Sequence, residues 1–472
     1  MFIQDGLDLQ LFGLLGDDNT YGDQAILNGL RGPVSFSLSQ FMAHTDGYRP
    51  NNDDTQRQYD AFVQGEFGAS TSAQVEVSRS ERESGDLQNV FFPTLINEAL
   101  RNDTDVDTQR FGLRQVINAS SDVLVSIIRQ ERDASAELDD PDFPLTIVSN
   151  QESWKAEAQY LTKGGGIAAI VGASYFDGET YDALISPFFV DEARFTPRHV
   201  NAHAYFSFAT RAPWPRVQLG VAYDDLTSDV GEQSELNPKI GVIWKPADFV
   251  TLRAAAFRVL KRRINADQGL EPTQLAGFNQ FFDDQNGTVS ESGGLAADFE
   301  LHPRLWSGLH VMRRDLKVPF FNTPTEVFFD EQRVDSVGGY VYWLPNQRLT
   351  LSLQPEYQDF DHGAAFDTMR LTEIPLDIRF FFPVGLWMGA SVTRVEQKGQ
   401  FDGPGGVVAE GSDSFWLLDA SLAYRLPRRR GTISLQGTNL LSEDFRFQEI
   451  DLNVAPRYIP ETQVVLRVSI SL

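Results

Sequence analysis

The chain ends in the sequence VVLRVSISL, Val464 to Leu472, in which every second residue is apolar. Successive side chains of a strand point to opposite faces, so this segment predicts a strand with one apolar and one polar face. The same alternation occurs in SWKAEAQY at 153–160 and in RVQLGVAY at 216–223. Such strands fit either a half-buried soluble sheet or a membrane barrel with a wet interior.

Strand length favours the membrane barrel. Soluble strands centre on about 5–6 residues, whereas a tilted membrane strand needs about 9–11. Segments such as 198–210 and 332–342 reach that greater length without a breaker. The sequence has no run of about 18 apolar residues from which a transmembrane helix could form. We therefore expect the chain to cross the membrane with strands.

The connections between strands are of two kinds. Compact reversals rich in Gly, Pro, Asn and Asp occur at 31–33, 68–70, 118–120, 163–166, 211–215, 245–248, 301–304, 344–346, 382–385 and 426–431. Ten short turns alternating with eleven longer loops give about 22 strands, give or take two, with both termini on the short-turn side. Outer-membrane barrels combine short periplasmic turns with long extracellular loops in this way. The segment 274–282 could be a strand, but the even count places it in an extracellular loop at 261–287.

Aromatic residues agree with this arrangement. Tryptophan suits a membrane–water boundary because it combines an apolar ring with one N–H donor. We predict that all seven tryptophans are membrane-interface residues, five near short turns and two near the opposite rim: Trp214, Trp244, Trp306, Trp343, Trp387, Trp154 and Trp416. Four Phe-Phe pairs fall in the expected extracellular loops and are candidate substrate contacts: Phe91 and Phe92, Phe188 and Phe189, Phe281 and Phe282, Phe328 and Phe329.

Composition limits the chemistry. The 472 residues include 40 Lys and Arg against 66 Asp and Glu, a net charge of −26, which argues against a nucleic-acid partner. Cysteine is absent, so disulfides and thiol chemistry are excluded. His199 and His203 share one face of a strand, but no HExxH pattern accompanies them, and we interpret them as lumen-facing polar residues. We expect no catalytic or metal site, no enzyme activity and no cofactor, apart from adventitious divalent cations at acidic loops.

Two segments resemble a known family. GTNLLSEDFRF at 437–447, followed by PRY at 456–458 and the terminal strand, resembles the closing hairpin of TonB-dependent outer-membrane transporters. LNPKIGVIWKPADFVTLR at 236–253 resembles a mid-barrel hairpin of the same family. The resemblance implies 22 strands, a Gram-negative outer membrane and substrate uptake. It covers the barrel only, because no plug domain or TonB box is recognised before the first strand.

A second resemblance competes with the first. TDGYRPNND at 45–53 and LEPTQLAGFNQFFDD at 270–284 are similar to segments of barrels that close long tetratricopeptide-repeat envelope proteins. That resemblance implies export or anchoring rather than import.

The sequence thus predicts one all-β domain, residues 1–472, forming an up-and-down antiparallel barrel with both termini in the periplasm. A lumen of this width is normally plugged, so we expect a plug domain or a periplasmic partner outside this chain, which we take to be part of a longer precursor because no signal peptide opens it. The predicted function is a pore or receptor for substrate uptake. The alternatives are an export barrel of a repeat-containing protein and a non-conducting scaffold.

The expected surroundings are outer-membrane lipid and lipopolysaccharide. A basic cluster at the outer end of one strand could meet lipopolysaccharide phosphates, and ordinary solvated charge is the alternative: Arg258, Lys261, Arg262 and Arg263.

Overall fold

The computed structural model describes residues 5–141, 143–209, 214–228, 231–262, 268–323, 326–363, 366–450 and 456–472. Within these ranges no helix is long and apolar enough to cross a membrane. Almost all of the regular structure in these ranges is strand, and the helical elements described there are three single 3₁₀ turns: η1 (Pro93–Leu95), η3 (Pro404–Gly406) and η4 (Pro427–Arg429).

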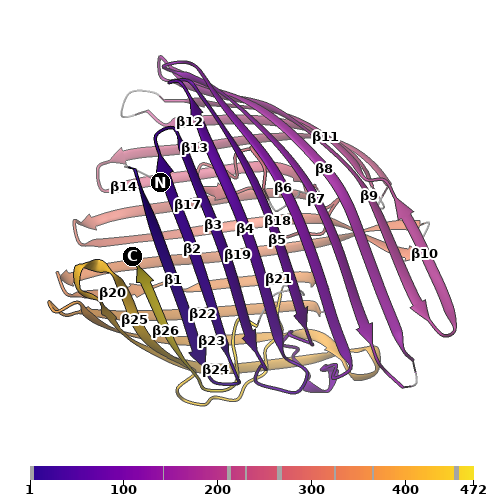
Figure 1. The fold of residues 1–472 in the computed structure, drawn as a ribbon. Helices are drawn as coiled ribbons and strands as arrows, with labels where there is room; N and C mark the ends of the chain where they lie inside the picture. Colours follow the sequence, from indigo (N-terminus) through magenta and orange to yellow (C-terminus); the bar gives the residue numbers. More distant parts are fainter. Residues whose placement is uncertain are drawn as a thin grey trace.

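The strands follow one another as antiparallel hairpins (Figure 1). The first half contains β1 (Gly6–Gly16), β2 (Tyr21–Arg31), β3 (Val34–Thr45), β4 (Asp54–Phe67), β5 (Thr71–Ser84), β6 (Leu100–Asn118), β7 (Ser121–Leu138), β8 (Leu145–Gly164), β9 (Ile167–Ser186), β10 (Phe189–Phe195), β11 (Arg198–Phe208), β12 (Arg216–Ser228) and β13 (Gly231–Ala247). The second half contains β14 (Val250–Leu260), β15 (Gln274–Leu275), β16 (Phe278–Asn279), β17 (Val289–His302), β18 (Leu305–Thr323), β19 (Glu326–Asn346), β20 (Leu349–Leu353), β21 (Glu356–Gly363), β22 (Phe366–Phe381), β23 (Leu386–Gly403), β24 (Val407–Arg425), β25 (Gly431–Thr438) and β26 (Gln463–Ser471).

Twenty-four of these strands form one sheet, in which two long strands are each broken in two. β10 and β11 both pair with β9, and β20 and β21 both pair with β19. The breaks contain Pro197 and Pro355, which have no N–H to donate to a neighbouring strand. Counting each broken strand once gives a barrel of 22 strands, as the sequence predicts.

The sheet closes on itself because β1 pairs with both β2 and β26. Closure leaves no free sheet edge, so every strand has a hydrogen-bonding neighbour on each side, as a membrane interior demands. Both termini lie at the rim that carries the short turns (Figure 1): Gly6 faces Leu30 beside the turn at 32–33, and the Leu472 amide donates to the Leu9 carbonyl.

The outward face is the apolar one. In β12 the side chains of Leu219, Val221 and Tyr223 are 40–45% exposed, whereas the alternate residues Ala222 and Asp224 are buried inside the barrel. A soluble sheet would bury the apolar set instead. The alternation read from the sequence therefore places lipid on the outside and polar groups in the lumen, and the prediction of an all-β membrane barrel is confirmed.

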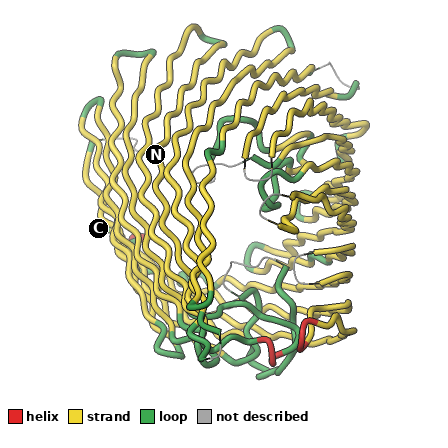
Figure 2. Tube along the Cα trace, turned by 90° about the vertical axis from the view of Figure 1, so that its right-hand side faces the viewer, coloured by secondary structure: helices red, strands yellow, loops and turns green. Residues whose placement is uncertain are grey.

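The rim opposite the termini is built mainly from strand. β8, β9 and β19 have 20, 20 and 21 residues, about twice the length needed to cross the membrane, so their hairpins project beyond it. Long non-strand connections occur at 85–99, 261–288 and 439–462. Figure 2 shows such loops, in green, at this rim and inside the strand wall. The expected loop at 261–287 adds no strand to the barrel wall in its described part, as predicted, and β15 and β16 form a small hairpin within it.

Candidate functional site

The connection 261–288, called here the inner loop, folds into the lumen; residues 263–267 of it lie outside the described part. Side chains of the barrel wall hold its backbone. Lys155 Nζ donates to the Gln268 carbonyl at 2.7 Å, and Gln159 Nε2 donates to the Leu270 carbonyl at 2.6 Å. On the opposite side of the loop the Ala276 amide donates to Gln218 Oε1 at 2.6 Å. These contacts join the loop to β8 and β12.

The inner loop reaches about half-way through the membrane. A methyl group added at Gly241 would lie only 2.9 Å from the Ala276 Cβ, so the tip of the loop is against the wall at this level. Gly241 pairs with Ala255, five residues above the start of β14. At about 3.3 Å per residue and a tilt of about 40°, that position is about 13 Å above the short-turn rim, in an apolar band about 25 Å tall.

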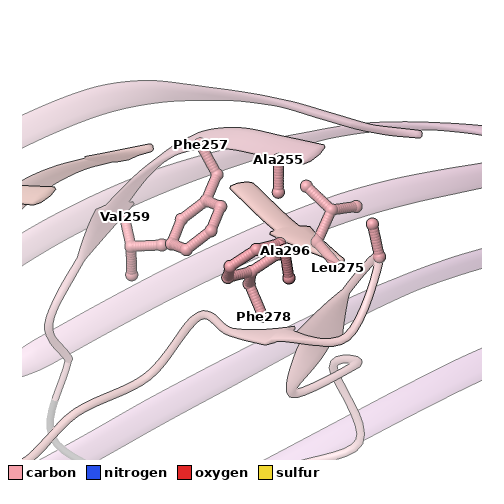
Figure 3. Close-up of a cluster of buried hydrophobic side chains, with 7 residues drawn as sticks. Ala255, Phe257, Val259, Leu275, Phe278 and Ala296 are labelled. Carbon is pink, nitrogen blue, oxygen red and sulfur yellow. The ribbon is translucent and has the colours of Figure 1, made fainter. Parts of the chain in front are cut away.

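An apolar cluster fixes this tip. Leu275 and Phe278 of the inner loop pack against Ala255 and Phe257 of β14 and Ala296 of β17 (Figure 3). Leu275 is 1% exposed and Phe278 is 6% exposed. Gly294, next to Phe278, leaves room for the ring, because a Cβ there would lie 2.4 Å from it. The barrel wall thus has small residues at the place where the Phe278 ring packs against it.

A buried ionic network holds the other half of the inner loop. Its charged members come from β8, β11, β12, β13 and the loop itself, and each is at most 5% exposed: Lys155, Glu157, His199, His203, Asp224, Lys239, Arg262 and Glu271. Lys155, Lys239 and Arg262 balance Glu157, Asp224 and Glu271, so the network is neutral when the histidines are neutral. Such balance is needed because an unpaired buried charge is costly.

Glu271 lies at the centre of this network. Arg262 contacts it at 2.7 Å and Lys239 at 3.2 Å, while the Tyr205 hydroxyl donates to the same carboxylate at 2.5 Å. Burial by itself raises the pKa of Glu271, but the attraction of Arg262 and Lys239 outweighs burial and holds the pKa well below its ordinary value. The carboxylate is therefore charged throughout the physiological range and anchors the loop.

Asp224 is the second anchor. It contacts His199 Nε2 at 3.0 Å and accepts hydrogen bonds from Asn201 at 2.8 Å and Asn237 at 2.6 Å. His203 stands beside Glu271, with 4.0 Å between Nδ1 and the carboxylate. The sequence prediction that His199 and His203 are polar residues facing the lumen is confirmed. No group of three or more His, Asp or Glu residues in the described part of the chain is arranged to hold a metal ion.

The connection 85–99 and the described parts of the connection 439–462, residues 439–450 and 456–462, also enter the barrel, near β22 to β24. Phe91 stacks on Phe401 at 4.3 Å, and Phe445 stacks on Phe415 at 3.9 Å. The two connections are joined by Asn89, whose amide donates to Glu449 and to the Tyr458 carbonyl. The chain thus fills part of its own lumen with three connections from one rim.

A cavity of about 1210 Å³, called here the chamber, lies between the inner loop, the connection 439–462 and the barrel wall at β14, β17, β18, β19, β21 and β22. Gly277 and Phe278, at the tip of the inner loop, line the chamber at its lower end. Ile450 and Arg457 line it from the connection 439–462. Its upper wall includes Asp330, near the outer end of β19. The chamber therefore extends from the middle of the membrane towards the rim opposite the termini.

The predicted phenylalanine contacts are distributed over three environments. Phe281 and Phe282 line the chamber. Phe91 is 2% exposed, and with Phe92 it packs against wall residues of β21 to β23, among them Phe366 and Phe401. The remaining four lie exposed at the far ends of hairpins: Phe188, Phe189, Phe328 and Phe329. Only one of the four pairs is therefore placed where it meets the chamber.

The tryptophans fall into two groups, because the register of the strands places some on the outer face and others on the lumen face. Trp154, Trp244, Trp343 and Trp416 are 41–51% exposed on the outer face, and Trp214 is exposed in its turn. Trp306 lies opposite Tyr342, a residue of the lumen face, and Trp387 lies opposite Ala423, which is 1% exposed in the lumen. Because directly opposite residues share a face of the sheet, Trp306 and Trp387 point inwards. The prediction that all seven border lipid is wrong for these two, since closeness to a turn does not reveal the face.

The predicted basic cluster does not form one exposed patch. Arg262 is 3% exposed and turned into the ionic network, and Lys261 donates to the Phe282 carbonyl. Arg258 pairs with Glu235 and Glu291 on the outer face. Arg263 lies outside the described residues. Arg262 is thus a structural ion-pair partner that sequence reasoning assigned to the surface, because only the folded loop brings it to Glu271.

The fold resembles solved structures of transporters and receptors. The structure titled "Copper transporter OprC" matches with a TM-score of 0.78 at 11% identity, over 100% of this chain and 81% of that one. The FrpB iron transporter of Neisseria meningitidis matches with 0.77 at 11% identity, over 100% and 82%. BauA, the ferric preacinetobactin receptor of Acinetobacter baumannii, matches with 0.72 at 10% identity, over 99% and 80%.

No family model and no curated protein matches the sequence significantly. The structural likeness confirms, at the level of the fold, the predicted resemblance to the barrels of TonB-dependent transporters. These three structures are named as transporters or receptors, and their chains extend beyond the part that this chain covers.

Proposed function

We propose that this protein is an outer-membrane transport receptor of a Gram-negative bacterium, which binds a substrate from outside in the chamber and lets it pass through the lumen. The observation that carries the proposal is the chamber itself, a mixed polar and apolar cavity inside a closed barrel, on the side of the long connections. The chamber is somewhat larger than the roughly 300–1,000 Å³ of common ligand pockets, and like them it combines aromatic side chains with polar groups. The membrane location follows from the apolar outer face.

In this proposal the short-turn rim and both termini face the periplasm, and a plug domain or a periplasmic partner outside this chain fills the lower lumen. Two features support it. The inner loop ends about half-way through the membrane, and a 22-stranded lumen is of the size that natural transporters keep plugged. Outer-membrane lipid and lipopolysaccharide surround the barrel, and the receptor works without a bound cofactor, with divalent cations at its acidic connections only adventitious.

Planar-bilayer recording tests the proposal. The chain alone is reconstituted beside a variant in which residues 268–285 are replaced by a short Gly-Ser linker. We expect a measurable conductance for the chain alone and a severalfold larger one for the variant, because the inner loop obstructs the lumen. Equal conductances would contradict the role of the inner loop, and a closed pore in both would contradict the transport function in favour of a scaffold.

A further inference from the structure

The chamber carries an imbalance of charge. Three arginines line it, and each has an acidic partner: Arg253 with Asp298 at 2.7 Å, Arg314 with Asp284, and Arg457 with Glu373 at 2.9 Å. Their positive charge is thereby neutralised before any substrate enters. An anion in the chamber would have to compete with these carboxylates.

Two lining carboxylates have no such counterpart. Asp330 accepts a hydrogen bond from the Gln332 side chain at 3.1 Å, and Glu356 accepts one from Gln358, also at 3.1 Å. Within the described ranges, no base forms an ion pair with Asp330 or with Glu356. Glu356 also lies directly opposite Glu373, and Arg457 forms its ion pair with Glu373.

The two carboxylates and the two glutamine amides form a row along one wall of the chamber, called here the polar track. Asp330 and Gln332 lie on β19, and Gln358 and Glu356 continue on β21. Glu356 pairs with Gly338, eight residues from Asp330 along β19, which is about 26 Å at about 3.3 Å per residue. Carboxylates thus stand at both ends of the chamber and amides stand between them.

Aromatic rings line the chamber beside the polar track. Phe278, Phe281 and Phe282 of the inner loop line one side of the chamber, and Phe360 and Phe366 line the wall. A phenyl ring offers no hydrogen-bond partner to a hydroxyl group, but its face attracts a cation and accepts an apolar body. Rings of this kind already hold cations here, since Arg314 lies 3.7 Å from the centre of the Phe282 ring.

From this combination we propose that the chamber binds an organic cation with an apolar body, an amine or a quaternary ammonium compound, and discriminates against anionic metal chelates. The inference rests on the proposed transport function and names its substrate class. The net charge of −26 favours the same ligands, because it concentrates cations near the surface before they bind. The named cargo of BauA, a ferric siderophore, belongs to that protein and is not carried over.

Isothermal titration of the detergent-solubilised full chain tests the inference. The probes are benzyltrimethylammonium as the cation, benzyl alcohol as a neutral compound, and ferric tris-catecholate as an anionic chelate. We expect one benzyltrimethylammonium to bind per chain, with a dissociation constant at least tenfold lower than that of either other probe. Tighter binding of ferric tris-catecholate or equal binding of benzyl alcohol would overturn the inference.

The carboxylates are then tested by substitution. The double variant Asp330→Asn, Glu356→Gln should bind benzyltrimethylammonium about tenfold more weakly, because it removes both carboxylates, which stand about 26 Å apart, and the single ammonium group binds at one of them. The matched control is Glu331→Gln, an exposed residue on the opposite face of β19, which should leave binding unchanged. Unchanged binding in the double variant would contradict the assignment of these carboxylates to the binding site. Titration does not depend on conductance, so a closed pore with selective cation binding would reject transport but keep the binding site.

Discussion

At the scale of single residues, Glu271 determines how the inner loop is held. The residue is 4% exposed, and its side chain contacts Lys239, Arg262 and the Tyr205 hydroxyl. Lys239 and Tyr205 belong to the barrel wall, so these contacts join the loop to the wall. A buried ion pair contributes little net stability as a whole, but removal of one partner leaves the other charge unpaired in the interior. The network therefore specifies one position of the loop more than it stabilises the barrel.

The variant Glu271→Gln should release the inner loop. It leaves Arg262 and Lys239 without their main counter-ion, which costs about 3–5 kcal/mol of docking free energy. A spin label at Gln274→Cys, in a protein without native cysteine, should become mobile. The control Glu291→Gln removes a carboxylate whose side chain is 71% exposed. In this control variant the spin label at position 274 should stay immobile. An immobile label in both variants would contradict the anchoring role.

Acid should release the inner loop only at low pH. The pKa of Glu271 is lowered in the folded protein, so its contribution is fully present above the unfolded value of about 4.3 and is lost as the pH falls through the folded value. The mobility of the same spin label should stay constant from pH 8 to about pH 5 and rise only at more acidic pH. Release near pH 6 to 7 would contradict the anchoring role of Glu271.

At the scale of elements, the inner loop is held from two sides, by charge towards β8 and β11 to β13, and by apolar packing towards β14 and β17. The first contact depends on Glu271 and Arg262, and the second on Leu275 and Phe278. The two connections at 85–99 and 439–462 are held chiefly by stacked phenylalanines. Each connection therefore depends on its own part of the wall.

Phe278→Ala should loosen the tip of the inner loop. The substitution empties a buried ring site and costs about 3–5 kcal/mol, as large-to-small changes in cores do. Hydrogen exchange of the amides at 274–279 should become markedly faster, while that of β14 stays slow because its strand neighbours are unchanged. Phe67→Ala is the matched control, since Phe67 is 65% exposed at the short-turn rim. Equal exchange in the two variants would show that the cluster does not hold the tip.

At the scale of the whole molecule, the barrel is defined by the difference between its two faces. Leu38 of β3 points outwards and is 47% exposed, and the adjacent Ser37 points into the lumen. The two residues are neighbours at nearly the same depth. A comparison between them therefore separates the effect of lipid from the effect of the strand.

Leu38→Arg should destabilise the barrel in lipid and Ser37→Arg should not. A cationic side chain on the lipid face costs about 2–4 kcal/mol near the middle of the membrane, whereas a lumen position stays hydrated. Reversible unfolding in lipid vesicles, followed by tryptophan fluorescence, measures the difference in the free energy of unfolding. Equal losses for both variants would argue against lipid on the outer face.

The sequence by itself determined the barrel. Period-two segments such as 216–223, compact turns such as 31–33 and 68–70, and an even strand count are local signals, because each depends on a few adjacent residues. They gave the strand number, the common rim of both termini and the position of the inner loop between its neighbours. The two broken strands did not disturb the count, since a proline interrupts hydrogen bonding without turning the chain.

Only the tertiary structure decided what lies inside the barrel. Arg262 and Glu271 are separated by nine positions in a polar connection, and nothing local to them shows that Lys239 and Asp224 meet them in the lumen. The same holds for Trp306 and Trp387, whose face depends on register. It also holds for the chamber, whose walls come from two connections and from strands as far apart in sequence as β14 and β22. Loop docking depends on long-range contacts between side chains, whereas strand formation and turning depend on near neighbours.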